Sequence, residues 1–153
     1  MNRSSSSRIM AIDLGDKRIG IALSDPSWTI ASGFGVIKRS SRQSDFDKIG
    51  HIAGENNVFC IIVGLPTLPS GEEGTRAAWA RDYASSLADA LGIQVKLWDE
   101  SLTTVDAEAS MRARGYSQNR RRERVDSVAA AFILQSYLES NRSEDPSLEN
   151  EDF

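Results

Sequence analysis

The chain combines short apolar runs with longer stretches in which apolar residues recur at helical spacing. Apolar runs bounded by glycine or polar residues predict five strands, over residues 8–14, 18–23, 30–37, 58–63 and 93–98. The run at 58–63 (VFCIIV) is apolar on both faces, which is typical of a strand in the middle of a sheet. Helical spacing predicts four helices, over residues 44–55 with Ser44 as N-cap, 77–91, 103–115 and 125–138.

The order of these elements indicates an α/β fold. Three strands joined by short links come first, and alternating helices and strands follow. This order predicts a mixed five-stranded sheet with helices on both faces. A chain of 153 residues has the size of one domain, which we place at residues 8–139. We expect residues 1–7 to be flexible and the acidic tail 140–153 to be disordered.

The cysteine and histidine content excludes several kinds of site. The single cysteine, Cys60, rules out internal disulfides and thiolate zinc sites, and the single histidine, His51, rules out paired-histidine metal sites. A Ser-His-Asp triad is disfavoured as well, so the chemistry has to use carboxylates, hydroxyls and basic groups. The polar start and the lack of an apolar stretch near about 18 residues predict a cytoplasmic protein.

Charged residues are unevenly distributed along the chain. The formal net charge is −4, and residues 140–153 account for all of it, with five acidic residues against Arg142. Residues 1–139 therefore carry 17 basic and 17 acidic side chains. They include a basic block that only Glu123 opposes, namely Arg112, Arg114, Arg120, Arg121, Arg122 and Arg124. A local block of this kind favours phosphate binding despite the acidic total.

Four acidic residues stand where predicted elements begin or end. They are Asp13 at the end of the first strand, Asp99 and Glu100 directly after the fifth, and Asp126 at the start of the last helix. Ligands collect beyond the carboxyl ends of parallel strands, so we expect these carboxylates to converge. Such a cluster repels itself unless a cation neutralises it, and oxygen ligands favour Mg²⁺ or Mn²⁺. Taken singly, Asp126 is equally well explained by the helix dipole, and Asp99 or Glu100 better by a loop or capping role.

Four segments carry a stronger signal together: 13–25 (DLGDKRIGIALSD), 64–77 (GLPTLPSGEEGTRA), 97–104 (LWDESLTT) and 125–138 (VDSVAAAFILQSYL). In this order they resemble the YqgF/RuvX family, whose members are described as Holliday-junction-resolvase-like proteins and as pre-16S rRNA nucleases. The resemblance covers nearly the whole chain from Arg8 to Leu138. It implies an RNase H-like fold and a metal-dependent nuclease.

The resemblance also implies the residues of the site. The family's acidic residues fall on Asp13, Glu100 and Asp126, which are expected to bind one or two Mg²⁺ or Mn²⁺ ions, with Asp99 as a further candidate ligand. Family members usually have arginine after the Asp-Glu pair, whereas this chain has Ser101. Further residues are candidates for contacts with nucleic acid, namely seven basic residues and two threonines at a predicted helix start: Lys17, Arg18, Arg76, Thr103, Thr104, Arg120, Arg121, Arg122 and Arg124. Plain helix capping is the other explanation of the threonines.

Three functions remain open at this point. The first is hydrolysis of phosphodiester bonds in structured RNA, in the maturation of the 5′ end of a 16S rRNA precursor. The second is resolution of four-way DNA junctions at the same site, which needs a homodimer because two strands are cut. The chain is compatible with either a monomer or a homodimer. The third is a non-catalytic RNA-binding factor in ribosome assembly or transcription, an alternative that Ser101 keeps open.

Overall fold

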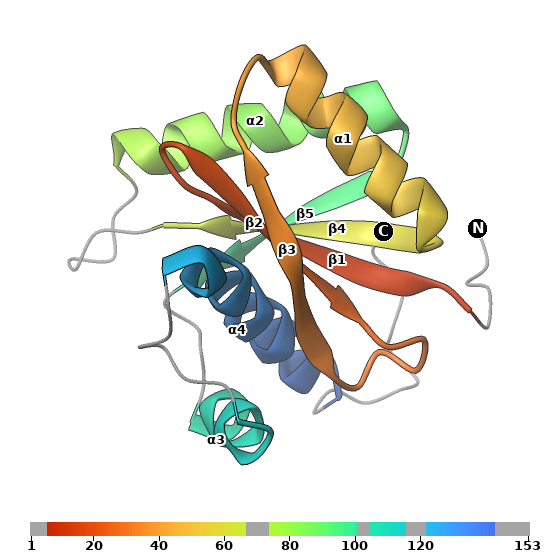
Figure 1. The fold of residues 1–153 in the computed structure, drawn as a ribbon, viewed down its shortest axis with the longest axis vertical. Coiled ribbons are helices and arrows are strands. Elements are labelled where there is room, and N and C mark those ends of the chain that lie inside the picture. The colour runs from red at the N-terminus through yellow and green to blue at the C-terminus, as the bar shows by residue number, and fades with distance from the viewer. Residues whose placement is uncertain (1–5, 67–73, 101–104, 116–121, 143–153) are drawn as a thin grey trace.

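The computed structural model describes residues 6–66, 74–100, 105–115 and 122–142, with the backbone alone at 105, 106, 122–126 and 142. These residues form five strands and four helices (Figure 1). In chain order they are β1 (Arg8–Leu14), β2 (Arg18–Ser24), β3 (Ala31–Lys38), α1 (Arg42–Glu55), β4 (Val58–Leu65), α2 (Thr75–Leu91), β5 (Gln94–Asp99), α3 (Val105–Ala113) and α4 (Arg122–Arg142).

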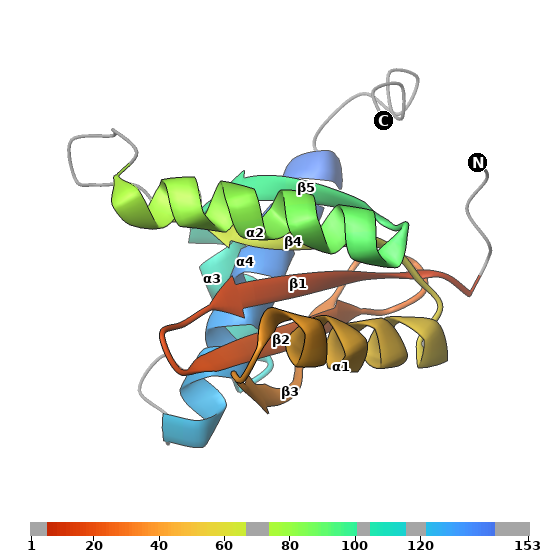
Figure 2. The same ribbon diagram turned by 90° about the horizontal axis from the view of Figure 1, so that it is seen from above.

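The strands form one mixed sheet in the order β3-β2-β1-β4-β5. β1, β2 and β3 pair antiparallel, and β1, β4 and β5 pair parallel. α1 and α2 lie on one face of the sheet and α4 lies on the other (Figures 1 and 2). The predicted mixed α/β sheet with helices on both faces is therefore confirmed. Among the described helices, none has both the length and the apolar content that a membrane span needs.

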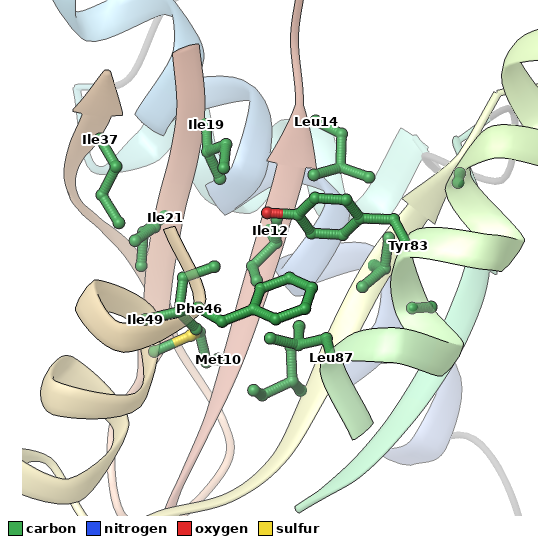
Figure 3. Close-up of a cluster of buried hydrophobic side chains, with 14 of the residues drawn as sticks. Met10, Ile12, Leu14, Ile19, Ile21, Ile37, Phe46, Ile49, Tyr83 and Leu87 are labelled. Atoms are coloured by element: carbon green, nitrogen blue, oxygen red, sulfur yellow. The ribbon is translucent and has the colours of Figure 1, made fainter. Parts of the chain in front are cut away.

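Side chains that alternate along β1 enter two separate cores. Met10 and Ile12 pack under α1 and α2, whereas Ile9 and Ala11 pack under α4. Under α1 and α2, the rings of Phe46 and Tyr83 meet edge to face over β1, with their centroids 5.1 Å apart (Figure 3). Both faces of the central strand are thus buried, which explains why the apolar runs of the middle strands are continuous.

Glycine allows α4 to lie very close to the sheet. A Cβ added to Gly33 of β3 would stand 3.2 Å from the backbone oxygen of Ser127 in α4. The helix presents Ala130 and Ala131, both fully buried, to the same side. α4 is therefore held at a short distance from β2 and β3, and the start of its described side chains contacts the edge strand β3.

Two predicted helix starts are wrong. α1 begins at Arg42, because the Ser41 side chain accepts a hydrogen bond from the Ser44 amide, so Ser41 and not Ser44 is the N-cap. The buried Asp45 carboxylate adds to this cap by accepting a hydrogen bond from the Ser40 amide. α4 begins at Arg122, three residues earlier than predicted, because the polar arginine-rich segment continues the helix.

Candidate active site

Asp13 is the residue before the last in β1, and the register surrounds it with glycines. Its neighbour Ile12 belongs to the core under α1 and α2, so Asp13 faces the opposite side, which α4 covers. Asp13 pairs with Gly20 of β2, and Gly64 of β4 stands level with it, one residue after the Ile12–Val63 pair. Neither glycine places a side chain in the space beside the Asp13 carboxylate.

Glu100 fills part of the space that Gly64 leaves. A Cβ on Gly64 would stand 3.0 Å from Oε2 of Glu100, 3.1 Å from its Cγ and 2.8 Å from Cδ1 of Ile133. The Glu100 carboxylate therefore lies over β4, on the same face of the sheet as Asp13 and one strand away. Two acids 87 positions apart in the sequence are brought side by side by the pairing of β1, β4 and β5.

The environment of Glu100 opposes its negative charge. Burial raises the pKa of this carboxyl above its ordinary value, and the neighbouring Asp99 charge raises it further. Arg76 acts in the opposite direction, because its positive charge favours the ionised carboxylate. A further positive charge placed beside Glu100 would therefore stabilise its ionised form.

Asp99 lies on the other side of the sheet. It pairs with Leu65 of β4, and both Leu65 and Leu97 belong to the core under α1 and α2. The alternation along β5 thus directs Asp99 toward α2, whereas Glu100 reaches over Gly64. Asp99 and Glu100, whose roles the sequence alone could not distinguish, therefore have different surroundings.

Arg76, in the first turn of α2, connects the acids to the turn between β1 and β2. Its Nη1 is 2.7 Å from Oδ1 of Asp16, and its Nη2 donates to the Leu14 carbonyl oxygen at 3.2 Å. The hydrogen bond to Asp16 raises the pKa of Arg76, and the charges of Asp16, Glu100 and Asp13 add to this effect. The guanidinium therefore interacts electrostatically with both candidate catalytic carboxylates while it holds the turn that follows Asp13.

A second arginine fixes the same turn from the other side. Nη1 of Arg39 donates to the carbonyl oxygens of Gly15 and Asp16, each at 3.0 Å. The guanidinium of Arg39 also lies 4.7 Å from the centre of the Trp79 ring. The turn itself is tight, since a Cβ on Gly15 would stand 2.7 Å from the Arg18 carbonyl oxygen. Asp13 thus sits at the end of a strand whose outgoing turn is held by two guanidinium groups.

Asp126 lies inside α4 rather than at its start. It is the fifth residue of the helix, beyond the first turn in which the helix dipole acts most strongly. Its side chain lies outside the described residues. Among the described side chains, no group of three or more histidine, cysteine, aspartate or glutamate residues is placed to hold a metal ion. The described part of the site is therefore the pair Asp13 and Glu100.

The remaining predicted contacts divide into two groups. Lys17 is exposed and Arg18 half-buried, at the turn that follows Asp13. The others lie outside the described side chains, namely Thr103, Thr104, Arg120, Arg121, Arg122 and Arg124. Ser101, which stands where family members usually have arginine, lies outside the described residues as well.

Sequence reasoning missed three contributors to the site. Gly64 was visible as the glycine that ends an apolar run, but its use as room for Glu100 depends on the register. Asp16 and Arg39 had no signal of their own, because each acts through a contact with a residue more than 20 positions away.

Comparison with protein families gives a match over almost the whole chain. The family model RuvX, described as Holliday junction resolvase, matches residues 7–140. A relative from Myxococcus xanthus is 40% identical over 146 residues, which cover 95% of this chain and 97% of the relative. Another, from Thermoanaerobacter pseudethanolicus, is 44% identical over 137 residues, covering 89% of this chain and 99% of that one. Both relatives are named as candidate pre-16S rRNA nucleases.

Solved structures support the fold. The RuvC protein of T. thermophilus in complex with a Holliday junction substrate superposes with a TM-score of 0.59 at 16% identity, over 88% of this chain and 96% of that one. The Fowlpox virus resolvase with its junction DNA superposes with a TM-score of 0.53 at 12% identity, over 88% and 98% of the two chains. At these identities the likeness concerns the fold alone, and the predicted RNase H-like fold is confirmed.

Proposed function

The chain belongs to the RuvX family, and from this membership we propose that it is a metal-dependent nuclease that hydrolyses phosphodiester bonds in structured RNA. One observation carries the proposal: the Glu100 carboxylate lies over Gly64, one strand away from Asp13 and on the same face of the sheet. These two acids and the Arg76 guanidinium form an anionic site at the carboxyl ends of the parallel strands, which is where ligands bind in α/β folds. Asp126, seven positions before Ile133 in the helix that covers this face, is the third proposed member.

The residues present fit a divalent cation. The donors are carboxylate oxygens without histidine or thiolate, which is the chemistry that suits Mg²⁺ and Mn²⁺. The missing Cβ of Gly64 lets the partly buried Glu100 place its carboxylate over β4, on the same face of the sheet as Asp13. Asp13, Glu100 and Asp126 would hold one or two such ions, and Asp99 would act on Glu100 through its charge. When bound there, the cation supplies activation of water and stabilisation of the departing oxygen.

The chain's own residues orient the substrate and the acids. Arg76 donates hydrogen bonds to Asp16 and to the Leu14 carbonyl oxygen, and so fixes the backbone that follows Asp13 at the end of β1. Lys17 and Arg18 at the same turn would contact backbone phosphates, which fixes the position of a nucleic acid without reading its sequence. In this chain Arg76 also brings a guanidinium to the site, where family members usually have an arginine at the position of Ser101.

The substrate we propose is the 16S rRNA precursor, because the relatives with 40–44% identity are named as nucleases of it. Cleavage at its 5′ end is part of the proposal and rests on the family resemblance alone. A four-way DNA junction is the alternative, and the description of the family model is the observation that favours it. The proposed chemistry is the same for both substrates, so the choice between them is a question for experiment.

The experiment compares cleavage of a labelled precursor transcript and of a labelled four-way DNA junction with Mg²⁺, Mn²⁺ or EDTA. The variants are Asp13→Asn, Glu100→Gln and, as a matched control, Asp89→Asn, which changes an exposed acid of α2. We expect metal-dependent cutting of the RNA by the wild type and by Asp89→Asn, and loss of cutting in both site variants. If the protein cut only the DNA junction, the junction and not the RNA would be its substrate. Unchanged RNA cutting by Asp13→Asn would refute the nuclease site.

A further inference from the structure

The edge strand β3 exposes an aromatic ring to solvent. Among the described residues, the large hydrophobic side chains with the greatest exposure are Phe34 at 50% and Ile30 at 42%. Phe34 stands between Gly33 and Gly35, and neither neighbour has a side chain that could cover its ring. A half-exposed phenylalanine in the middle of a strand offers apolar ring surface that gains free energy when a planar partner covers it.

A bulge places Phe34 in this position. Ile21 of β2 pairs with Gly35, and the next residue, Ala22, pairs with Gly33, so Phe34 is the extra residue of β3. Bulges change the direction of a side chain and interrupt regular pairing. They also protect an edge strand against pairing with another chain. A second copy that extends the sheet through β3 is therefore disfavoured as the occupant of this surface.

Phe34 lies near the candidate active site. Val36 pairs with Gly20, and Gly20 pairs with Asp13, so Val36 and Asp13 stand in one row across the sheet. Phe34 is two residues from Val36 along β3. With about 4.8 Å between strands and about 3.3 Å per residue, the Cα atoms of Phe34 and Asp13 are on the order of 12 Å apart.

Basic residues lie toward both ends of β3. Arg18 pairs with Lys38 at one end, where Lys17 is also exposed. At the other end, the Arg114 guanidinium donates to the carbonyl oxygen of Ala31. β3 itself has no acidic residue. Asp25 and Glu139 also lie near the Ala31 end, so the positive charge is concentrated at Lys17, Arg18 and Lys38. An exposed aromatic ring on the same strand as basic residues is a combination with which proteins bind single-stranded nucleic acids.

We propose that Phe34 stacks on an unpaired base of the nucleic-acid substrate and so docks a single-stranded segment at β3, two strands away from Asp13. The inference rests on the proposed nuclease function and narrows its substrate class to nucleic acids with unpaired nucleotides next to the cleaved bond. Lys38 and Arg18 contact the backbone phosphates of the same segment. Stacking tolerates any base, so this surface selects unpaired nucleotides rather than a sequence.

The test measures binding in EDTA, which separates affinity from cleavage. Fluorescence anisotropy compares a labelled single-stranded RNA with a fully paired duplex of the same sequence. Phe34→Ala is expected to weaken single-strand binding by about tenfold and to leave duplex binding unchanged. Phe34→Trp keeps a stacking ring and is expected to retain the affinity. The control is Ile30→Ala, which removes the other exposed apolar side chain and is expected to have no effect.

Equal single-strand affinity of Phe34→Ala and the wild type would overturn the proposal. So would a wild type that does not bind single-stranded RNA, or a Phe34→Ala variant whose only change is loss of a dimer in sedimentation. Cleavage assays keep this proposal separate from the nuclease function. If the wild type bound single-stranded RNA through Phe34 but cut no substrate, the stacking proposal would be supported and the nuclease proposal refuted. Cutting that persists with unaltered binding in Phe34→Ala would remove the stacking surface alone.

Discussion

Substitution of Gly64 by alanine tests whether the room beside Asp13 belongs to Glu100. The added Cβ would stand 2.8 Å from Cδ1 of Ile133 and 3.0 Å from Oε2 of Glu100. Both distances are shorter than ordinary contacts, so both side chains have to move. Ile133 of α4 is buried against the sheet, and overpacking of this kind costs about 1–3 kcal/mol. Relief of glycine's backbone entropy returns about 0.5–1 kcal/mol. The net expectation is a free energy of unfolding that is lower by about 1 kcal/mol.

The effect on catalysis should exceed the effect on stability. Displacement of a catalytic group by about 1 Å can lower a rate by about 100-fold, and the Glu100 carboxylate is the group in the way. We therefore expect kcat/KM for RNA cleavage to fall by about 10- to 100-fold, measured at a temperature where the variant is fully folded. Urea denaturation gives the free energy of unfolding of the same samples.

A matched control separates the contact from the general effect of a methyl group. Gly54 lies in the last turn of α1, and a Cβ built there meets nothing within 4 Å. Gly54→Ala is expected to be as active as the wild type and slightly more stable. If Gly64→Ala also kept both wild-type activity and wild-type stability, the placement of Glu100 over Gly64 would be wrong.

Four further predictions concern other parts of the molecule. Arg76→Ala should lower kcat at least tenfold with little loss of stability, and Arg76→Lys should restore only part of it, because one ammonium cannot hold both Asp16 and the Leu14 oxygen. Addition of Mn²⁺ should raise the Tm of the wild type but not that of Asp13→Asn, in a thermal-shift assay. Burial raises the pKa of Cys60 to about 11, so its thiol should react with an alkylating reagent at pH 8 only after unfolding. Partial burial would raise the pKa of Asp25, but hydrogen bonds from Ile30, Ser27 and Thr29 outweigh this and lower it from 3.8 to about 2. The folded-state pKa is the lower one, so the stabilisation is complete above about pH 4 and is lost as the pH falls toward 2. Since solvent screens this partly exposed group, Asp25→Asn should lower the free energy of unfolding at pH 7 by about 1 kcal/mol and flatten its decline over that acidic range.

The parts of the fold that depend on local pattern were predictable, and the parts that depend on register were not. The apolar run VFCIIV contains enough information to define a central strand, and Asp13 at the end of β1 was visible as an acid in an apolar context. The contact of Glu100 with Gly64 arises from the pairing of β4 with β5, which no local pattern encodes. For the same reason the opposite directions of Asp99 and Glu100 emerged only from the structure.

Helix boundaries show a similar division. Ser44 and Ser41 are both acceptable caps by residue type, and the choice is made by the Ser41 side chain together with the buried Asp45, which packs where the chain enters α1. The arginine-rich start of α4 has no apolar periodicity, so the last helix was predicted to begin three residues late. Both errors have local causes: residue type does not choose between two serine caps, and a polar helical turn has no apolar periodicity to detect.

The last helix of the chain has a consequence for newly made protein. α4 provides eight of the 15 buried residues described for the core on its side of the sheet, and it also carries Asp126. While a ribosome is still translating the chain, residues 8–100 can emerge with Asp13 and Glu100 before that core exists. The apolar face of the sheet on this side is buried only when α4 has been synthesised and has docked. The proposed active site includes Asp126, so it stays incomplete in a nascent chain until that point.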